Sequence, residues 1–135
     1  LVSNQLVALA SQISMDRFVV IFVLSVVFVV LGMFLEPPAM IFGFLPSFLP
    51  MLAHAGVDQV WWGVLFCVNM GLGQLIPPVA VNLFISHQLA EVSYEDAVRA
   101  AVPFIAVMVA DMVLMALFPQ IPLMLPHILF DYPIP

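Results

Sequence analysis

The chain has 135 residues, of which 65% are hydrophobic and 7% are charged. Soluble domains are about half apolar and about a quarter charged, so this composition predicts an all-α integral membrane protein. Eight acidic residues stand against two arginines, Arg17 and Arg99, and the net charge of −6 excludes the basic patch that nucleic acid or anionic headgroups require.

Residues 1–16 mix serine, asparagine and glutamine with apolar side chains at spacings of three and four, which is typical of an amphipathic helix. The segment is too polar to face lipid on every side, so we expect it at the membrane interface or against further protein. A bilayer crossing takes about 20 helical residues, so the chain allows only a few crossings. We expect it to be one half of a transporter built from two related repeats.

Residues 17–53 predict a re-entrant helical hairpin with its tip near residues 32–38. An apolar run fills the first half and ends at Glu36-Pro37-Pro38. The second half contains two further prolines and is short and kinked for a full crossing. A hairpin that enters and leaves on the same side therefore fits better than two crossings, although length alone permits both.

A second apolar run, residues 60–88, predicts a discontinuous transmembrane helix that is broken at residues 73–78. Two adjacent prolines lie in the break, and their missing N–H groups leave the carbonyls of Gly73 and Gln74 without helical partners. An unpaired carbonyl in hydrocarbon costs several kcal/mol, so such a break is tolerated where it lines a cavity or is buried in protein. Transporters place ion and substrate sites at such breaks.

The break therefore predicts an ion site and a substrate site. Hard cations prefer oxygen ligands, which the carbonyls of Gly73 and Gln74 supply. We expect the second half-helix to begin at Pro77, followed by Pro78, with its positive N-terminal end facing a substrate carboxylate. The alternative is a simple proline kink that neighbouring helices satisfy.

Five further residues complete the predicted site. Pro37 and Pro38 free two carbonyls at the hairpin tip in the same way, and Glu36 either belongs to the site or caps the helix that follows. Two asparagines flank the break by about one turn, and we expect them to satisfy its loose backbone groups. These residues are Met33, Phe34, Glu36, Asn69 and Asn82.

Residues 94–118 predict an interfacial helix start followed by the final transmembrane helix. Ser93 with Asp96 resembles a capping box and marks the start of this helix. Asp111 lies within the apolar run, where a structural hydrogen bond is favoured over a role in transport. Residues 119–135 form a proline-rich tail, which we expect to be irregular and to lie along the membrane surface.

The remaining reactive side chains do not predict an enzyme. Three histidines are too scattered for a metal site, and Cys67 is expected to be a small buried hydrophobic residue. The sequence has neither a His-Glu-x-x-His zinc motif nor a Gly-x-Ser-x-Gly nucleophile motif. The alternatives to a coupled transporter are an ion channel and a non-transporting membrane scaffold with re-entrant segments.

Several motifs together resemble the C-terminal portion of the large membrane (M, DctM-like) subunit of the tripartite ATP-independent periplasmic (TRAP) transporters. They include Leu-Gly-Met-Phe-Leu-Glu at residues 31–36, and Asn-x3-Gly-Gln-x2-Pro-Pro-Val-x2-Asn-Leu-Phe at residues 69–84. Prolines at 103, 119 and 126 also match. The resemblance covers nearly the whole chain.

This resemblance implies the C-terminal repeat of an elevator-type transport domain in the bacterial inner membrane, where the permease is a multi-pass protein. It implies sodium symport of a C4-dicarboxylate, sialic acid or a similar carboxylate, delivered by a periplasmic substrate-binding protein. The implied partners are the N-terminal half of the same subunit and a small membrane subunit. The resemblance makes sodium the ion expected at the carbonyls of Gly73 and Gln74. Relatives usually have Thr or Ser where this chain has Ile76, so a hydroxyl that would help to hold sodium is missing here.

Overall fold

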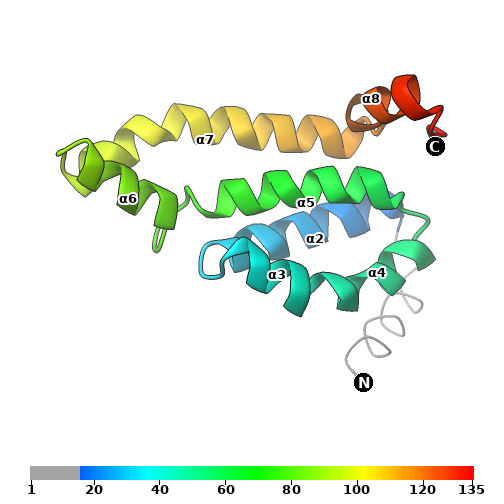
Figure 1. The fold of residues 1–135 in the computed structure, drawn as a ribbon, viewed down its shortest axis with the longest axis horizontal. Helices are drawn as coiled ribbons and strands as arrows, with labels where there is room; N and C mark the ends of the chain where they lie inside the picture. The colour runs from blue at the N-terminus through cyan, green and yellow to red at the C-terminus, as the bar shows by residue number, and fades with distance from the viewer. Residues whose placement is uncertain (1–15) are drawn as a thin grey trace.

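The computed structural model describes residues 16–135, and this part of the chain contains helices and no strand. The expected interfacial helix at the N-terminus therefore lies, apart from Asp16, outside the described residues. Figure 1 shows the helices as a bundle in which the elongated α7 runs along one side. The helices are α2 (Arg17–Gly32), α3 (Pro37–Gly43), α4 (Leu45–His54), α5 (Gln59–Gly73), α6 (Val81–Leu89), α7 (Tyr94–Leu117) and α8 (Gln120–Phe130).

Helices α2 and α5 pack side by side and run in the same direction through the core. Phe18 near the start of α2 meets Trp61 near the start of α5, with ring centroids 6.1 Å apart. Further along α2, Phe28 makes edge contacts with Trp62 at 5.7 Å and with Phe66 at 4.9 Å. All of these rings except that of Phe18 are at most 3% exposed, so an aromatic layer holds the two helices together.

Helices α3 and α4 return along α2, which gives the segment the shape of a helical hairpin (Figure 1). α2 ends at Gly32, and the N–H groups of Phe34 and Leu35 both donate to the carbonyl of Leu31 in the turn that follows. Phe48 of α4 packs against Phe28 of α2 at 5.3 Å. That the hairpin enters and leaves on the same side of a membrane stays a prediction.

The second helical segment is interrupted between α5 and α6. α5 ends at Gly73, and α6 begins only at Val81. The expectation that the second half-helix begins at Pro77 is wrong. Ala80 immediately before α6 has a left-handed backbone, with φ 45° and ψ 59°, so no helix that included Pro77 continues into α6.

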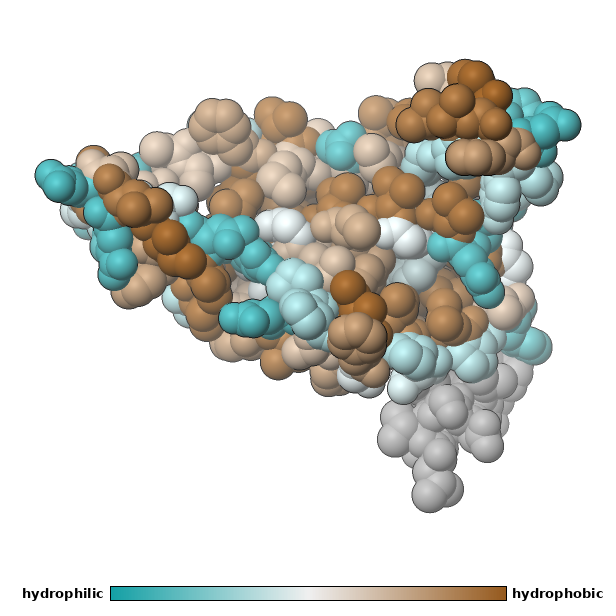
Figure 2. Space-filling view, viewed as in Figure 1, coloured by the Kyte–Doolittle hydropathy of each residue, from teal (hydrophilic) through white to brown (hydrophobic). Residues whose placement is uncertain are grey.

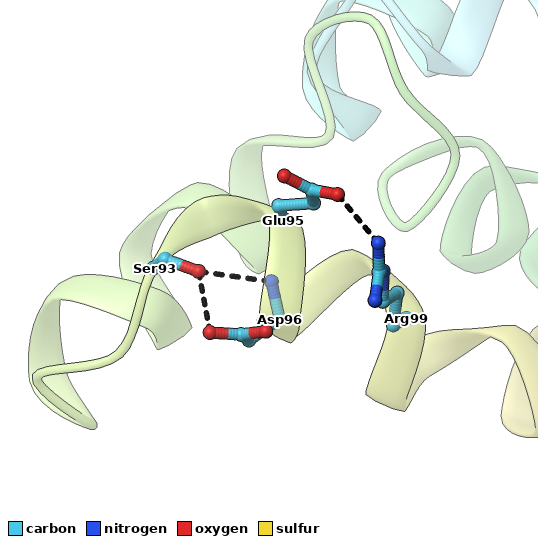
Figure 3. Close-up of polar contacts among 4 residues, drawn as sticks. All are labelled: Ser93, Glu95, Asp96 and Arg99. Atoms are coloured by element: carbon cyan, nitrogen blue, oxygen red, sulfur yellow. Dashed lines mark hydrogen bonds and ion pairs between the residues drawn. The ribbon is translucent and has the colours of Figure 1, made fainter.

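Helix α7 begins with the hydrogen bond that the sequence predicts. The hydroxyl of Ser93 accepts from the N–H of Asp96 at 3.1 Å and donates to the Asp96 carboxylate at 2.6 Å (Figure 3). The second arm of a capping box normally runs to the backbone N–H of the cap residue. Here the acidic side chain is one methylene shorter than glutamate, and it bonds to the cap hydroxyl instead.

Among residues 16–135, α7 is the helix that is long and apolar enough to cross a membrane. Its 24 residues span about 36 Å at 1.5 Å per residue, against a hydrocarbon core of about 30 Å. Pro103 lies inside α7 and removes a single hydrogen bond from the helix. One interior proline therefore leaves the helix intact.

The proline-rich tail forms a helix, so the expectation of an irregular segment is wrong. α8 accommodates Pro122 in its first turn, where the N–H groups have no intrahelical partner, and loses only one interior bond at Pro126. Beyond α8, the hydroxyl of Tyr132 donates to the carboxylate of Asp58 at 2.8 Å. This hydrogen bond raises the pKa of Tyr132 above its usual value and attaches the C-terminal segment to the start of α5.

Cys67 is exposed on α5, which corrects the expectation of a buried thiol. The buried residues Trp61, Leu65, Asn69 and Leu72 lie on other sides of α5, so the thiol is not part of the buried core of the described residues.

Candidate ion and substrate site

A pocket of about 290 Å³ lies where the hairpin tip meets the break between α5 and α6. Two parts of the chain that are nearly forty residues apart in sequence form its walls. Figure 1 shows the turn before α3 at the same end of the bundle as the C-terminal end of α5. The lining residues are Leu35, Glu36, Pro37, Gln74, Val81, Asn82 and Ile85.

Two glycines bring the hairpin tip and the helix break to the same place. A Cβ atom on Gly73 would lie 2.7 Å from the carbonyl carbon of Gly32 and 2.7 Å from the carbonyl oxygen of Val29. Side chains do not approach backbone this closely, so only glycine allows the ends of α2 and α5 to touch here. Both helices end at this contact, and their following turns therefore face one another.

The backbone of the break leaves one of the two predicted carbonyls free. The N–H of Ile76 donates to the carbonyl of Gly73 at 3.3 Å, so the expectation that Gly73 lacks a partner is wrong. A tight turn replaces the helical bond that Pro77 removes. The carbonyl of Gln74 accepts no hydrogen bond from residues 16–135, and Gln74 lines the pocket.

Glu36 occupies the N-cap position of α3, yet its side chain makes no capping hydrogen bond. The alternative in which Glu36 caps this helix is therefore not met, whereas Glu36 lines the pocket. Pro38 is the second residue of α3 and lacks one of the two N–H donors that a cap residue can bond. The carboxylate thus stays available for a ligand in the pocket.

The two asparagines differ in their positions, and neither satisfies the break. Asn82 lies in the first turn of α6 and lines the pocket, but its side chain makes no hydrogen bond within the described residues. Asn69 is fully buried in α5, and its side-chain oxygen and nitrogen have no partner among residues 16–135. Within residues 16–135, the expected bonds from these amides to the break are therefore absent.

The other predicted site residues surround the pocket without lining it. Phe34 is 61% exposed, and Met33 lies in the turn before it. Ile76 packs against the hydrophobic core, so a hydroxyl at this position would meet apolar neighbours. Pro77 and Pro78 are exposed in the turn and are joined by a cis peptide bond.

Four lining residues were not predicted from the sequence: Leu35, Pro37, Val81 and Ile85. Val81, Asn82 and Ile85 lie on one face of α6, since residues four apart share a helix face. The spacing from Val81 to Ile85 was therefore visible in the sequence. The sequence does not show that this face of α6 points toward the hairpin tip, because that depends on the fold.

Among residues 16–135, Glu36 is the only ionisable group that lines the pocket. Both arginines lie elsewhere: Arg99 pairs with Glu95 at 2.7 Å, with both side chains about three-quarters exposed (Figure 3), and Arg17 lies over the ring of Phe18 at 5.1 Å. No group of three or more histidine, cysteine, aspartate or glutamate side chains gathers within residues 16–135. The pocket therefore offers one negative charge and neutral oxygen atoms.

Most of this chain matches known proteins. The family described as the DctM component of the tripartite ATP-independent periplasmic transporter matches residues 2–121. The C4-dicarboxylate TRAP transporter large permease protein DctM of Pseudomonas aeruginosa is 27% identical over 117 residues, which cover 87% of this chain and 27% of that protein.

Two other relatives carry different substrates in their names. The isethionate TRAP transporter permease protein DctMQ of Oleidesulfovibrio alaskensis is 32% identical over 80% of this chain and 17% of its own length. The sialic acid TRAP transporter large permease protein SiaM of Vibrio cholerae is 27% identical over 89% of this chain and 28% of its own length. The chain thus spans about a quarter or less of the length of these relatives.

Proposed function

Because the chain belongs to the DctM component family of the tripartite ATP-independent periplasmic transporters, we propose that it forms part of a permease that imports a small organic anion together with sodium. The observation that carries this proposal is the pocket between the hairpin tip and the helix break. Discontinuous helices form ion and substrate sites in transporters because their ends expose unpaired backbone groups. Such a chain acts in transport rather than as an enzyme.

Sodium is proposed as a transported substrate that binds near Glu36 and the free carbonyl of Gln74. Both groups provide oxygen atoms, which hard cations prefer, and both residues line the pocket. A carboxylate without a protein cation beside it attracts a small cation. This supports sodium as the ion, with the amide of Asn82 as a further oxygen donor.

The same carboxylate supports coupling between the two substrates. An organic anion that enters the pocket meets the negative charge of Glu36, and two like charges about 4 Å apart repel by roughly 4 kcal/mol at an effective dielectric constant near 20. Sodium bound at Glu36 cancels this repulsion. Binding of the cation therefore favours binding of the anion, and the reverse holds by linkage.

The anion is proposed to bind at the N-terminal end of α6. This end carries the positive pole of the helix and unpaired N–H groups, and Val81 and Asn82 from it line the pocket. The relatives' names include a C4-dicarboxylate, isethionate and sialic acid. We propose the shared class, a small organic anion, for this chain.

The complete permease is proposed to contain the N-terminal half of the same subunit and a small membrane subunit, with a periplasmic substrate-binding protein that delivers the anion. The chain spans about 27% of the Pseudomonas relative, which supports a larger assembly. We place this assembly in the bacterial inner membrane, with α7 as a crossing helix. The hairpin and the broken helix would move together as an elevator-type transport domain, since Gly32 and Gly73 join them.

The test is uptake of an organic anion by the complete transporter in vesicles, measured against sodium concentration, for the parent and for Glu36→Gln. Glu36→Gln removes the charge that couples the two substrates, so the gain in apparent anion affinity that sodium produces, typically about 5- to 150-fold, should be lost and apparent sodium affinity should weaken. Glu91→Gln is the matched control, because Glu91 lies in the turn between α6 and α7 and does not line the pocket. An unchanged sodium response in folded, active Glu36→Gln permease would contradict the proposal.

A further inference from the structure

Asp111 is an acidic residue inside the apolar part of α7 that makes no hydrogen bond to residues 16–135. Its side chain is half-buried, and α7 is the helix that is long and apolar enough to cross a membrane. Asp111 lies six residues before the end of α7 at Leu117, which places it about 9 Å along the helix axis from that end. A carboxylate at this depth is costly against lipid and normally faces protein or water.

The chain itself supplies no cation for this carboxylate. Arg99 pairs with Glu95, and Arg17 lies over the ring of Phe18. His87 bonds the carbonyl of Val92 and His127 bonds that of Tyr132, while His54 lies at the end of α4. Any cationic partner of Asp111 must therefore come from outside these 135 residues.

Asp111 lies in the middle of a stripe of large apolar residues that repeat at spacings of three and four along α7 and end at Phe118, the residue after the helix. The flanking members are exposed, with Phe104 and Val107 at 69%, Leu114 at 46% and Phe118 at 51%. This is the spacing with which one helix packs against another along a seam. In Figure 1 α5 runs along one side of α7, and α8 lies beyond the C-terminal end of α7. We call the stripe the α7 outer seam; it consists of Phe104, Val107, Asp111, Leu114 and Phe118.

Apolar residues alone do not identify a protein contact in a membrane, because lipid satisfies them equally well. Asp111 at the centre of the seam indicates a protein contact, because lipid tails cannot form a hydrogen bond with a carboxylate. A single polar residue in such a seam also fixes the register of the two helices. The seam therefore fits one kind of occupant, a transmembrane helix with a hydrogen-bond donor at the depth of Asp111.

We propose that the α7 outer seam binds a transmembrane helix from the part of the large permease polypeptide that lies outside these 135 residues, and that this helix donates a hydrogen bond to Asp111. The proposal rests on the proposed function, in which this chain is part of a larger permease. The P. aeruginosa relative is almost four times as long as the region it shares with this chain, which provides the additional polypeptide. A second copy of the chain fits less well, because a symmetric seam would place two Asp111 carboxylates together.

The test uses the complete permease in native membranes with a photo-crosslinking amino acid in place of Val107. Val102 is the matched control: it is also an exposed valine of α7, at 56%, and lies nine residues before Asp111, on the opposite face of the helix. We expect position 107 to cross-link to a transmembrane helix of the same polypeptide, identified by mass spectrometry, and position 102 not to reach that helix. Cross-links from position 107 to a separate small subunit, to a second copy or to lipid alone would overturn the proposal.

Two variants test the role of Asp111. Interhelical hydrogen bonds in membranes contribute about 0.6 kcal/mol on average, so Asp111→Leu should reduce the cross-linked fraction from position 107 about threefold or more. Asp111→Asn should keep it, because the amide retains an acceptor. Equal loss in both variants would overturn the proposed hydrogen bond to Asp111.

The cross-linking experiment does not depend on transport. It therefore distinguishes a failure of sodium-coupled uptake in the parent from the absence of a helix at the α7 outer seam. If Asp111→Leu does not fold, the contrast between positions 107 and 102 in the parent still decides the proposal.

Discussion

Prolines leave three backbone carbonyls of this fold without a helical hydrogen-bond donor. The three carbonyls differ in whether another group replaces that donor. Pro119 cannot donate to the carbonyl of Met115, and the indole N–H of Trp61 donates to it at 2.8 Å. The carbonyl of Gly73 accepts from the N–H of Ile76, and that of Gln74 has no partner among residues 16–135. A proline therefore creates a potential ligand only where neither a side chain nor a turn replaces the lost donor.

Trp61→Phe should destabilise the permease by about 1 to 3 kcal/mol, because the carbonyl of Met115 then loses the donor that Pro119 cannot supply. Thermal unfolding of the purified permease in detergent measures this effect. Trp62→Phe is the matched control: Trp62 is as deeply buried, but its indole nitrogen has no hydrogen-bond partner within residues 16–135. Equal destabilisation by both variants would show that lost packing, and not the hydrogen bond, is responsible.

Gly73→Ala should destabilise the contact between α2 and α5 by about 1 to 3 kcal/mol, the usual cost of overpacking. Its Cβ would lie 2.7 Å from the backbone of Gly32, and backbone cannot move aside as a flexible side chain does. Gly63→Ala in the same helix is the control, since a Cβ there meets nothing within 4 Å. The unfolding temperatures of the two variants give the comparison, and similar values would contradict the close contact.

At the scale of elements, the break between α5 and α6 and the hairpin tip form one unit. The aromatic layer around Phe28 aligns α2 with α5, and the contact of Gly32 with Gly73 fixes their ends. The turns that follow are irregular, because prolines remove the donors that would continue each helix. Packing and chain chemistry together therefore place two irregular turns face to face across the pocket.

Replacing Pro77 and Pro78 by alanine should weaken apparent sodium affinity. The new N–H groups allow α5 to continue, so the carbonyls of Gly73 and Gln74 enter helical hydrogen bonds and the ion loses a ligand. Through coupling of about 1 to 3 kcal/mol, apparent substrate affinity should fall by about 5- to 150-fold. Uptake against sodium concentration in the complete transporter measures both. An unchanged sodium response in a folded, active variant would remove this break from the coupling mechanism.

At the scale of the whole molecule, the described residues leave the pocket and one side of α7 incompletely covered. Figure 2 shows hydrophobic side chains over much of one face, with hydrophilic side chains in small separate groups. α7 leaves its outer seam uncovered, and the pocket is lined from only one hairpin and one broken helix. In transporters built from two repeats, the substrate site lies between them.

The 135-residue chain alone should therefore show no sodium-dependent uptake when it is inserted into vesicles. The site needs walls from both repeats, and this chain supplies one set. Radiolabelled organic anion with an imposed sodium gradient measures uptake, and vesicles with the complete transporter serve as the positive control. Clear uptake by the isolated chain would contradict the division of the site between two halves.

The sequence by itself determined the membrane character, the helix start at Ser93 and the interruptions of helices near Glu36 and Gln74. These features are local, because apolar composition, a capping side chain and the missing N–H of proline act within a few residues of their position. The prediction of an irregular tail was wrong for α8. Pro122 lies in the first turn of this helix, where N–H groups have no intrahelical partner, so its missing N–H costs no hydrogen bond.

Only the tertiary structure decided which interrupted segments form a pocket and which freed carbonyls remain unpaired. Local sequence shows that Gly73 and Met115 each lose a donor, but not that Ile76 or Trp61 replaces it. Likewise, spacing places Val81 and Ile85 on one face of α6, while the contact of Gly32 with Gly73 decides that this face meets Glu36. The physical reason is that each of these outcomes depends on atoms brought together by packing of helices that are distant in the sequence, which no local pattern encodes.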